Sequence, residues 1–466
     1  MALQARFKLL LLCALSLSLA GFARATAQSN GAADNTPFRA TLSGSSEVDR
    51  LTDEIIQNQV DLLRLNARMR LQQLQNPWQG RGWFLANLGN ASLTATGAYI
   101  NGFGRYAYLH KKRLRAAPRD LFEHATWVRT MANLETCGAA AAENAVLVAK
   151  DERNRRNHSD LKALNRQALA LQAHIDNFLS SRAALVAAFS GAEKQRADAE
   201  AMVLQDLRNL SADEFARFYS DCRADSATNY LGYSLSFAIN AIAGTGAIIS
   251  NHATMINHGT AHYRTRLAGT SGITDIIASA ISLTAPWDLR YAGRFVARRQ
   301  FRKTSAEFHC TPVTLDQFHR HLNAYHAFAS SAVDAPAATL SSHERAYALA
   351  ARLFDQHKAM QSAQRRPSKL RFASQLIVAN ETAPTKMTNG IGSTIGAFKY
   401  TANPHERFEA VGGPAIAYGS GYSLATAELL RNQFWFEMSE ARARKEGRST
   451  RQVLSRELEE LNQVGK

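Results

Sequence analysis

Apolar residues recur at alternating three- and four-residue steps between residues 161 and 189, and this spacing constrains the fold more than any other feature. The positions share one face of a helix for about four heptads, and only Arg182 interrupts them. The stripe consists of Leu161, Leu164, Ala168, Leu171, Ile175, Phe178, Leu185 and Phe189. It predicts either a long amphipathic helix within a bundle or a coiled coil between chains, and we favour the bundle.

A second apolar seam lies near the start of the chain. Val48, Ile55, Leu62 and Met69 recur every seven residues, and Pro77 ends the pattern. Proline is sparse, with 10 in 466 residues, which favours long helices. Residues 375–380, QLIVAN, are the one segment that resembles a strand. We therefore predict a mainly α fold: a helical bundle with long amphipathic, coiled-coil-like helices and Gly/Ala-rich apolar helical hairpins.

Three segments of membrane-like length carry almost no charge. Residues 83–104 and 231–249 have no Asp, Glu, Lys or Arg, and residues 269–287 contain only Asp275. Gly, Ser, Thr and Asn dilute all three, which makes their hydropathy borderline for membrane spans. The segments are therefore compatible with membrane crossings or with apolar hairpins at a membrane surface.

A basic run follows the third segment, interleaved with aromatic residues. Arginines beside an apolar segment can bind lipid phosphates while aromatic side chains lie at the interface. The alternative is a solvated helix face. The candidate lipid- or polyanion-binding residues are Arg290, Arg294, Arg298, Arg299, Arg302 and Lys303. With a formal net charge of +16, we expect the chain to bind polyanions, and an exported chain meets anionic lipids or glycans before nucleic acid.

Residues 1–27 have the order of a secretory signal peptide. Arg6 and Lys8 precede a leucine-rich run, and Ala25-Thr26-Ala27 forms an A-x-A site. We therefore expect export to the periplasm, the cell envelope or the extracellular space, with membrane embedding as an alternative. The predicted segments are a linker over 28–44, a helical coiled-coil-like region over 45–225, an apolar glycine-rich hairpin with a basic flank over 226–303, and a C-terminal helical region over 304–466.

The cysteines and histidines offer two weak candidate sites. Cys222 and Cys310 flank the most apolar part of the chain, so a hairpin there would bring them together as a disulfide. His258 and His262 are four residues apart, a spacing that allows two imidazoles to bind one metal ion on a helix. No carboxylate of an HExxH motif lies between them, and solvated histidines are the commoner explanation. We therefore expect no cofactor, with a metal as the alternative.

A Gly-Ala step recurs at nearly constant spacing. TATGAYI, AGTGAII and STIGAFK place Gly97, Gly246 and Gly396 149 and 150 residues apart. The flanking residues align poorly, so chance similarity is the interpretation we favour over a threefold repeat.

Three functional hypotheses remain. The first is an exported, non-enzymatic helical envelope protein that contacts protein partners, or a second copy, through its helices and an anionic membrane surface through its basic run. The second is a membrane-inserting or pore-forming protein with glycine-rich helices. The third is an exported metal-dependent enzyme. Because no familiar catalytic motif is present, we favour a non-enzymatic role.

Overall fold

The structure, a computed structural model, describes residues 47–73, 77–110, 119–157, 159–255, 261–329 and 337–464. These ranges are almost entirely helical, and no strand occurs in them, which confirms the mainly α prediction. The predicted signal peptide and the 28–44 linker lie outside the described residues. The helices are α2 (Glu47–Gln73), α3 (Pro77–His110), α4 (Arg119–Arg156), α5 (Leu161–Val186), α6 (Gly191–Met255), α7 (Ala261–Glu307), α8 (Leu315–Ala329), α9 (Ala337–Phe398), α10 (Pro404–Lys445) and α11 (Thr450–Val464).

The strand predicted over residues 375–380 is wrong. This segment lies inside α9, a helix of 62 residues. A short apolar run bounded by polar residues has no period that distinguishes a buried strand from part of a buried helix. The short length of this apolar run was therefore a misleading indication of a strand.

The order of helices repeats three times along the chain. A long segment of about sixty residues comes first, namely α2 with α3, then α6, then α9. A return helix follows each long segment (α4, α7 and α10), and a shorter helix completes each unit (α5, α8 and α11). Gly97, Gly246 and Gly396 each lie on the long segment of one unit. This order supports the threefold repeat over chance similarity.

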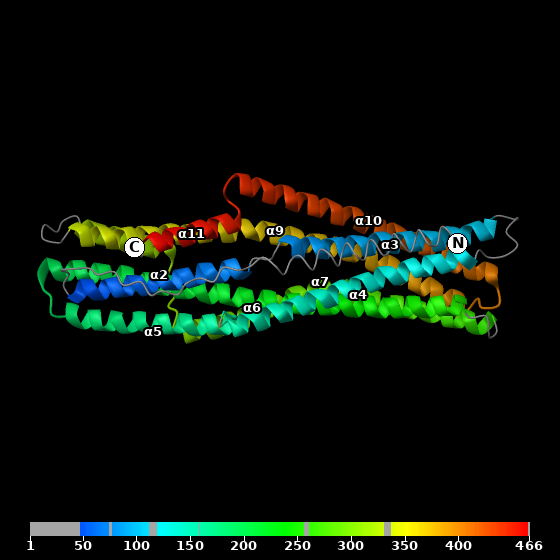
Figure 1. Ribbon diagram of the computed structural model, residues 1–466, viewed down its shortest axis with the longest axis horizontal. Helices are drawn as coiled ribbons and strands as arrows, with labels where there is room; N and C mark the ends of the chain where they lie inside the picture. The colour runs from blue at the N-terminus through cyan, green and yellow to red at the C-terminus, as the bar shows by residue number, and fades with distance from the viewer. Residues whose placement is uncertain are drawn as a thin grey trace.

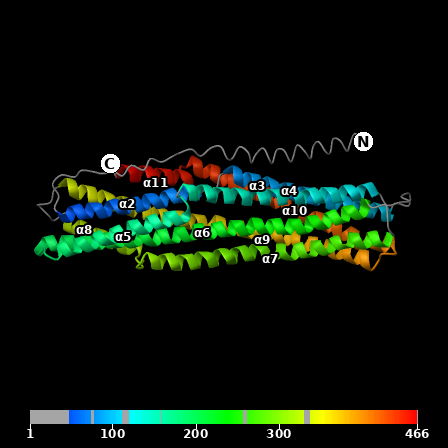
Figure 2. The same ribbon diagram turned by 60° about the horizontal axis from the view of Figure 1, so that its bottom comes forward.

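The helices form two consecutive bundles in one elongated molecule (Figure 1). The polar bundle contains α2, α5, α8, α11 and the first parts of α6 and α9. The glycine-rich bundle contains α3, α4, α10, most of α7 and the last parts of α6 and α9. Figure 2 shows α6, α7 and α9 running lengthwise along the other side of the molecule. The glycine-rich bundle therefore draws on all three helical regions predicted over 45–225, 226–303 and 304–466, and the polar bundle draws on the first and the third.

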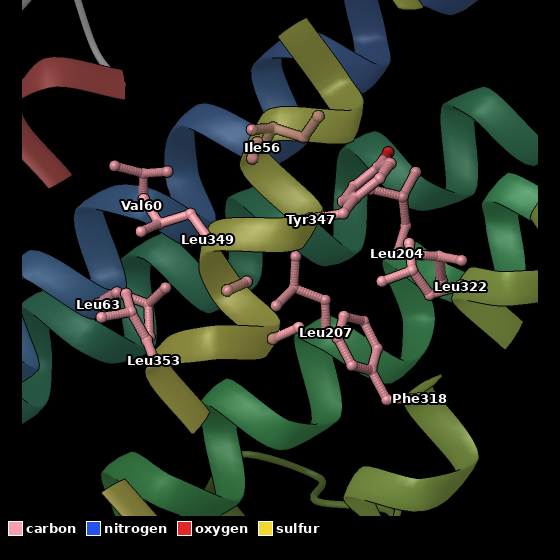
Figure 3. Close-up of a cluster of buried hydrophobic side chains, with 14 of the residues drawn as sticks. Ile56, Val60, Leu63, Leu204, Leu207, Phe318, Leu322, Tyr347, Leu349 and Leu353 are labelled. Atoms are coloured by element: carbon pink, nitrogen blue, oxygen red, sulfur yellow. The ribbon is translucent and has the colours of Figure 1, made fainter. Parts of the chain in front are cut away.

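The core of the polar bundle is made by α2, α6 and α9, which run in the same direction (Figure 1). Large side chains from all three helices converge there, together with Phe318 and Leu322 of α8 (Figure 3). The shorter helices cover the gaps: α5 packs on α2 and α6, α8 on α6 and α9, and α11 on α9 and α2. The polar bundle thus has an approximate threefold arrangement that matches the repeat.

Both predicted apolar seams face this core, except that Leu185 near the end of the α5 stripe is 38% exposed. Val48, Ile55, Leu62 and Met69 of α2 are all buried. The stripe of α5 packs within the chain on α2 and α6, as the bundle interpretation requires. Arg182, which interrupts the stripe, is buried and donates a hydrogen bond to Glu200 at 2.7 Å.

Polar side chains replace apolar ones at two levels of this core. At one level His343 of α9 contacts Asp53 of α2 at 2.8 Å and Glu200 of α6 at 3.1 Å. Burial alone lowers the pKa of His343, but the hydrogen bonds to both carboxylates outweigh burial and raise this pKa to about 9. For Glu200, burial alone raises the pKa, but the contacts with His343 and Arg182 outweigh burial and lower this pKa to about 2. The imidazolium therefore joins three helices, α9, α2 and α6.

The second polar level lies fourteen residues further along α6 and α9. His357 contacts Glu214 of α6 and, at 2.9 Å, Glu457 of α11. Arg70 of α2 completes this level by pairing with Glu214. Burial lowers the pKa of His357, whereas the charge of Glu214 and the hydrogen bonds to both carboxylates raise it to about 9. Fourteen residues are two heptads, so both polar levels occupy equivalent positions of the helix-packing repeat.

Candidate membrane-spanning bundle

The glycine-rich bundle consists of three helical hairpins: α3 with α4, the end of α6 with α7, and the end of α9 with α10. Each helix packs against its hairpin partner and against one helix of a neighbouring hairpin. The order around the bundle is α3, α4, α6, α7, α9 and α10, and α10 packs back against α3. Six antiparallel neighbours therefore close into a ring.

Glycines set the separation between helices of this ring. A Cβ atom at Gly390 would lie 2.6 Å from the backbone oxygen of Gly272, and one at Gly272 would meet the backbone oxygen of Gly390. A Cβ at Gly102 would lie 3.0 Å from the backbone nitrogen of Ile416. Because these obstacles are backbone atoms, any larger residue would force the helices apart.

The three glycines of the Gly-Ala repeat act alike within their hairpins. A Cβ at Gly97 would lie 2.8 Å from the backbone oxygen of Ala125, and one at Gly396 would lie 3.2 Å from that of Arg407. At Gly246 the obstacle is Thr274. Each glycine therefore faces the second helix of its own hairpin.

Small residues fill the interior of this bundle. Apart from Val128, Phe408, Val411 and Tyr418, its buried apolar residues are alanines. These alanines are Ala86, Ala91, Ala95, Ala98, Ala125, Ala132, Ala140, Ala243, Ala247, Ala253, Ala278, Ala379, Ala383, Ala397, Ala415 and Ala425. Tight packing of small residues is the usual way in which helices associate in lipid.

Large apolar residues instead cover the outside of the bundle. They include Leu85, Phe103, Leu134, Phe237, Ile248, Ile273, Ile277, Leu283, Ile377, Ile391, Ile395 and Leu424. The polar bundle has the opposite distribution, because its leucines, isoleucines and phenylalanines are mostly buried. Among the described residues, α6 and α7 are long and apolar enough to cross a membrane. These exposed apolar residues occur on all six helices, and extended exposed apolar surface is typical of protein- or membrane-interaction sites.

Aromatic and basic residues mark the level where the two bundles meet. Trp287, Tyr291 and Phe295 follow Leu283 at four-residue steps on one exposed face of α7, and Tyr291 is 75% exposed. Five members of the predicted basic run are exposed in the next turns, namely Arg294, Arg298, Arg299, Arg302 and Lys303. The sixth, Arg290, lies over the ring of Phe372 at 4.1 Å.

The last turns of α10 repeat this order. Phe434, Trp435, Phe436 and Met438 are exposed, and basic residues occupy the last turn of the helix. An apolar surface followed by aromatic and then basic residues is the pattern of a helix that leaves a bilayer.

A second aromatic level lies at the opposite end of the bundle. Tyr106 of α3, Tyr263 of α7 and Phe398 of α9 are all about half exposed there. Twenty-four residues separate Tyr263 from Trp287, which corresponds to about 36 Å of helix at 1.5 Å per residue. The hydrocarbon core of a bilayer is about 30 Å thick, and its headgroup regions bring the total to about 40–45 Å. The two aromatic levels therefore match the two interfaces of a bilayer.

An ion pair lies inside the ring. Arg129 of α4 donates a hydrogen bond to Asp275 of α7 at 2.7 Å, and the two side chains are 12% and 3% exposed. Asn389 of α9 donates to the same carboxylate oxygen at 3.3 Å. The Arg129 guanidinium also lies 5.3 Å from the ring centre of Tyr418 on α10. From the sequence, Asp275 was interpreted only as a charge that dilutes an apolar segment and Arg129 was missed, although a lone charge in such a segment is itself a signal.

The other predicted sites have different outcomes. His258 and the side chain of His262 lie outside the described residues, and no group of three or more His, Cys, Asp or Glu side chains within those residues could hold a metal. Cys222 and Cys310 carry free thiols, so the predicted bridge is not formed in this structure. Burial raises the pKa of the Cys222 thiol. Cys310 packs beside the cluster that contains Phe215 and Phe308.

Comparison of the chain with protein families, curated proteins and solved structures gives no match. What the glycine-rich bundle can do therefore follows from its own geometry. It has an apolar exterior, a tightly packed interior of small residues and one buried ion pair.

Proposed function

We propose that the protein is a non-enzymatic integral protein of the cell envelope, whose glycine-rich bundle crosses the bilayer and holds the polar bundle outside it. The observation that carries this proposal is the inverted packing, with alanines inside and large apolar side chains outside. In water, each exposed square ångström of apolar surface would cost roughly 25 cal/mol relative to burial. In lipid this cost disappears, and an interior of small residues is what helix association requires.

The arrangement of the asparagines supports membrane crossing despite borderline hydropathy. Asn90 of α3 donates a hydrogen bond to the backbone oxygen of Ala132 on α4 at 2.8 Å. Asn251 of α6 is buried and donates to Thr130 of α4 at 3.1 Å. Polar groups that bond to neighbouring helices lower hydropathy without facing lipid. The sequence average therefore understates how apolar the outer surface is.

The predicted signal peptide gives the orientation of the bundle. In the proposed topology the polar bundle and both described termini are on the exported side, as the predicted signal peptide requires. The opposite end carries Arg105, Arg264, Arg266, Lys399 and Arg407. Short basic connections are retained in the cytoplasm by the positive-inside rule. Six crossings with cytoplasmic turns after α3, α6 and α9 satisfy the signal peptide, whereas the basic run of α7 then lies on the exported side, against the positive-inside rule.

The exported face then has two contact surfaces. The basic run of α7 stands just outside the aromatic level, where lipid phosphates lie, and each exposed arginine there contributes about 1 kcal/mol to binding an anionic surface. The polar bundle projects beyond it and presents the outer faces of α5, α8 and α11 to protein partners. This arrangement combines the partner and lipid contacts of our first hypothesis with the membrane insertion of our second.

A matched pair of substitutions tests the proposal. Ile277 of α7 and Leu185 of α5 are both exposed, 47% and 38%, but Ile277 belongs to the glycine-rich bundle and Leu185 to the polar one. Lysine costs about 2.5–3.5 kcal/mol at the centre of a membrane helix and little on a wet surface. We expect Ile277→Lys to lose most membrane insertion and Leu185→Lys to behave as wild type.

Insertion is measured as the fraction of full-length protein that stays in the membrane pellet after extraction with alkaline carbonate. We expect wild type and Leu185→Lys to remain in the pellet and Ile277→Lys to be depleted from it. Release of the wild-type protein by carbonate would contradict the proposal and favour a peripheral protein. Equal retention of both variants would also contradict it, because a lipid-facing lysine must be costly.

A further inference from the structure

Every helix of the six-membered ring contributes a buried polar side chain. These residues are Thr94, Thr130, Asn133, Thr136, Glu143, Asn251, Asp275, Ser279, Lys386, Asn389 and Glu428. Ionisable residues inside membrane bundles are costly and usually mark the path of an ion or substrate. The helices outside the ring, α2, α5, α8 and α11, lie in the polar bundle (Figure 1). Among the described residues, no further helix therefore passes through the centre of the ring, and side chains of the six helices fill it.

Arg129 crosses this centre. It contacts Asp275 of α7, yet α4 and α7 are not neighbours in the ring, because α6 lies between them. It also lies over Tyr418 of α10, from which α4 is separated by α3. On α3, a Cβ at Gly97 would lie 2.8 Å from Cγ of Arg129. One long side chain thus reaches helices of all three hairpins.

Two buried oxygens point to a ligand at this level. Oδ1 of Asp275 and Oδ1 of Asn389 accept no hydrogen bond from any described residue. Asp275 is 2% exposed and Asn389 1% exposed. A buried carboxylate or amide oxygen without a partner is costly unless water or a cation fills its place. Carboxylate and amide oxygens are the ligands that hard cations prefer.

We propose that the six-helix ring is a closed path for small inorganic ions and that Arg129, held by Asp275, is its plug. The inference rests on the proposed crossing of the membrane by the glycine-rich bundle. In the closed state Arg129 fills the narrow level and its positive charge repels cations. When Arg129 leaves, Asp275 and Asn389 line the same level and favour cations. When Asp275 alone loses its charge, the freed arginine favours anions.

The test uses purified full-length protein in vesicles of phosphatidylcholine and phosphatidylglycerol loaded with KCl. Efflux of K⁺ is followed with a protonophore present, and efflux of Cl⁻ with valinomycin present, so that either ion can move alone. The variants are Arg129→Ala and Asp275→Asn. Arg81→Ala is the matched control, because Arg81 pairs with Glu437 at 2.8 Å but both side chains are about 40% exposed at the bundle edge.

We expect Arg129→Ala to raise K⁺ efflux at least about tenfold over wild type, the change produced when a barrier falls by about 1.4 kcal/mol. Asp275→Asn should raise Cl⁻ efflux more than K⁺ efflux. The control should match wild type. If both variants insert as wild type does and neither raises the efflux of either ion, the proposal of a plugged path is overturned.

Insertion is scored separately by carbonate extraction of the same vesicles. Loss of wild-type insertion would refute the membrane proposal itself, whereas normal insertion without efflux would refute only the path. A second measurement covers variants that fold poorly. Ala278 is fully buried in the ring, and in an Ala278→Cys background Arg129→Lys should speed modification of the new thiol by a cationic, water-soluble thiosulfonate. An unchanged rate would count against a plug at Arg129.

Discussion

Raising the pH from about 6.5 to 9 should destabilise the polar bundle, because His343 and His357 are held as imidazolium ions in its core. Each imidazole lies between two carboxylates, so both ring nitrogens serve as donors only in the protonated form. The pKa of each histidine is about 9 in the folded chain, against an ordinary value of 6.5. The folded chain therefore holds two protons that the unfolded chain releases in this interval.

The sign and size of the effect follow from this difference. A raised pKa gives stability that is complete below about 6.5 and is lost as the pH rises towards 9. A pKa difference of one unit between the folded and unfolded chain equals about 1.36 kcal/mol. Each histidine therefore contributes on the order of 3 kcal/mol to the free energy of unfolding, and this contribution is lost across the interval. Between these limits the free energy of unfolding should fall by about 1.4 kcal/mol per pH unit for each histidine.

The assay is urea unfolding of the full-length protein in detergent micelles at several pH values. Unfolding of the polar bundle is monitored by amide hydrogen exchange in peptides from α2, α6 and α9. We expect His343→Gln to reduce the slope by about half and its stability to converge with that of wild type above pH 9. His174→Gln is the control, because this histidine lies exposed on α5. A wild-type stability that stays flat between pH 6.5 and 9 would refute the imidazolium assignment.

Four other outcomes follow from the same structure. Gly390→Ala should destabilise the glycine-rich bundle by about 1–3 kcal/mol in thermal unfolding, since its Cβ would meet backbone; Gly138→Ala, with open space around it, should not, and equal effects would contradict the ring packing. Cys222 should resist thiol reagents until the protein unfolds, because it is buried and its thiol pKa is raised; rapid labelling of the folded protein would argue against this burial. Replacing the six basic residues of the α7 run with glutamine should reduce the anionic lipid retained in native mass spectrometry; unchanged retention would remove the run from the interface. On the acid side, the contribution of Glu200 is present above about pH 4.5 and should be lost as the pH falls towards 2; in the Glu200→Gln variant this loss should be smaller.

The sequence predicted the helices and their apolar seams well, because a period near 3.5 residues is visible without tertiary information. Val48, Ile55 and the α5 stripe were assigned to a core and are found in one, apart from Leu185, which is exposed. Arg182 shows the limit of this approach. It reads as an interruption of the stripe, but it is buried because Glu200, eighteen residues further along the chain, pairs with it.

The two polar levels and the pair of Arg129 with Asp275 could not be predicted in the same way. Periodicity treats His343 and His357 as defects in an apolar seam, since nothing local indicates that carboxylates on other helices will meet them. Arg129 and Asp275 are 146 residues apart, and only closure of the ring brings them together. The glycine repeat was visible, but its meaning came from the order of helices and not from the flanking sequence.

The most direct test of the account is the side of the membrane on which each end of the glycine-rich bundle lies. Single-cysteine variants Arg298→Cys and Lys399→Cys, with Cys137, Cys222 and Cys310 replaced by serine, are treated with an impermeant maleimide. Right-side-out and inverted vesicles are labelled in parallel. We expect the thiol at 298 to be labelled only in right-side-out vesicles and the thiol at 399 only in inverted ones. Labelling of both thiols from the same side would contradict a bundle that crosses the bilayer.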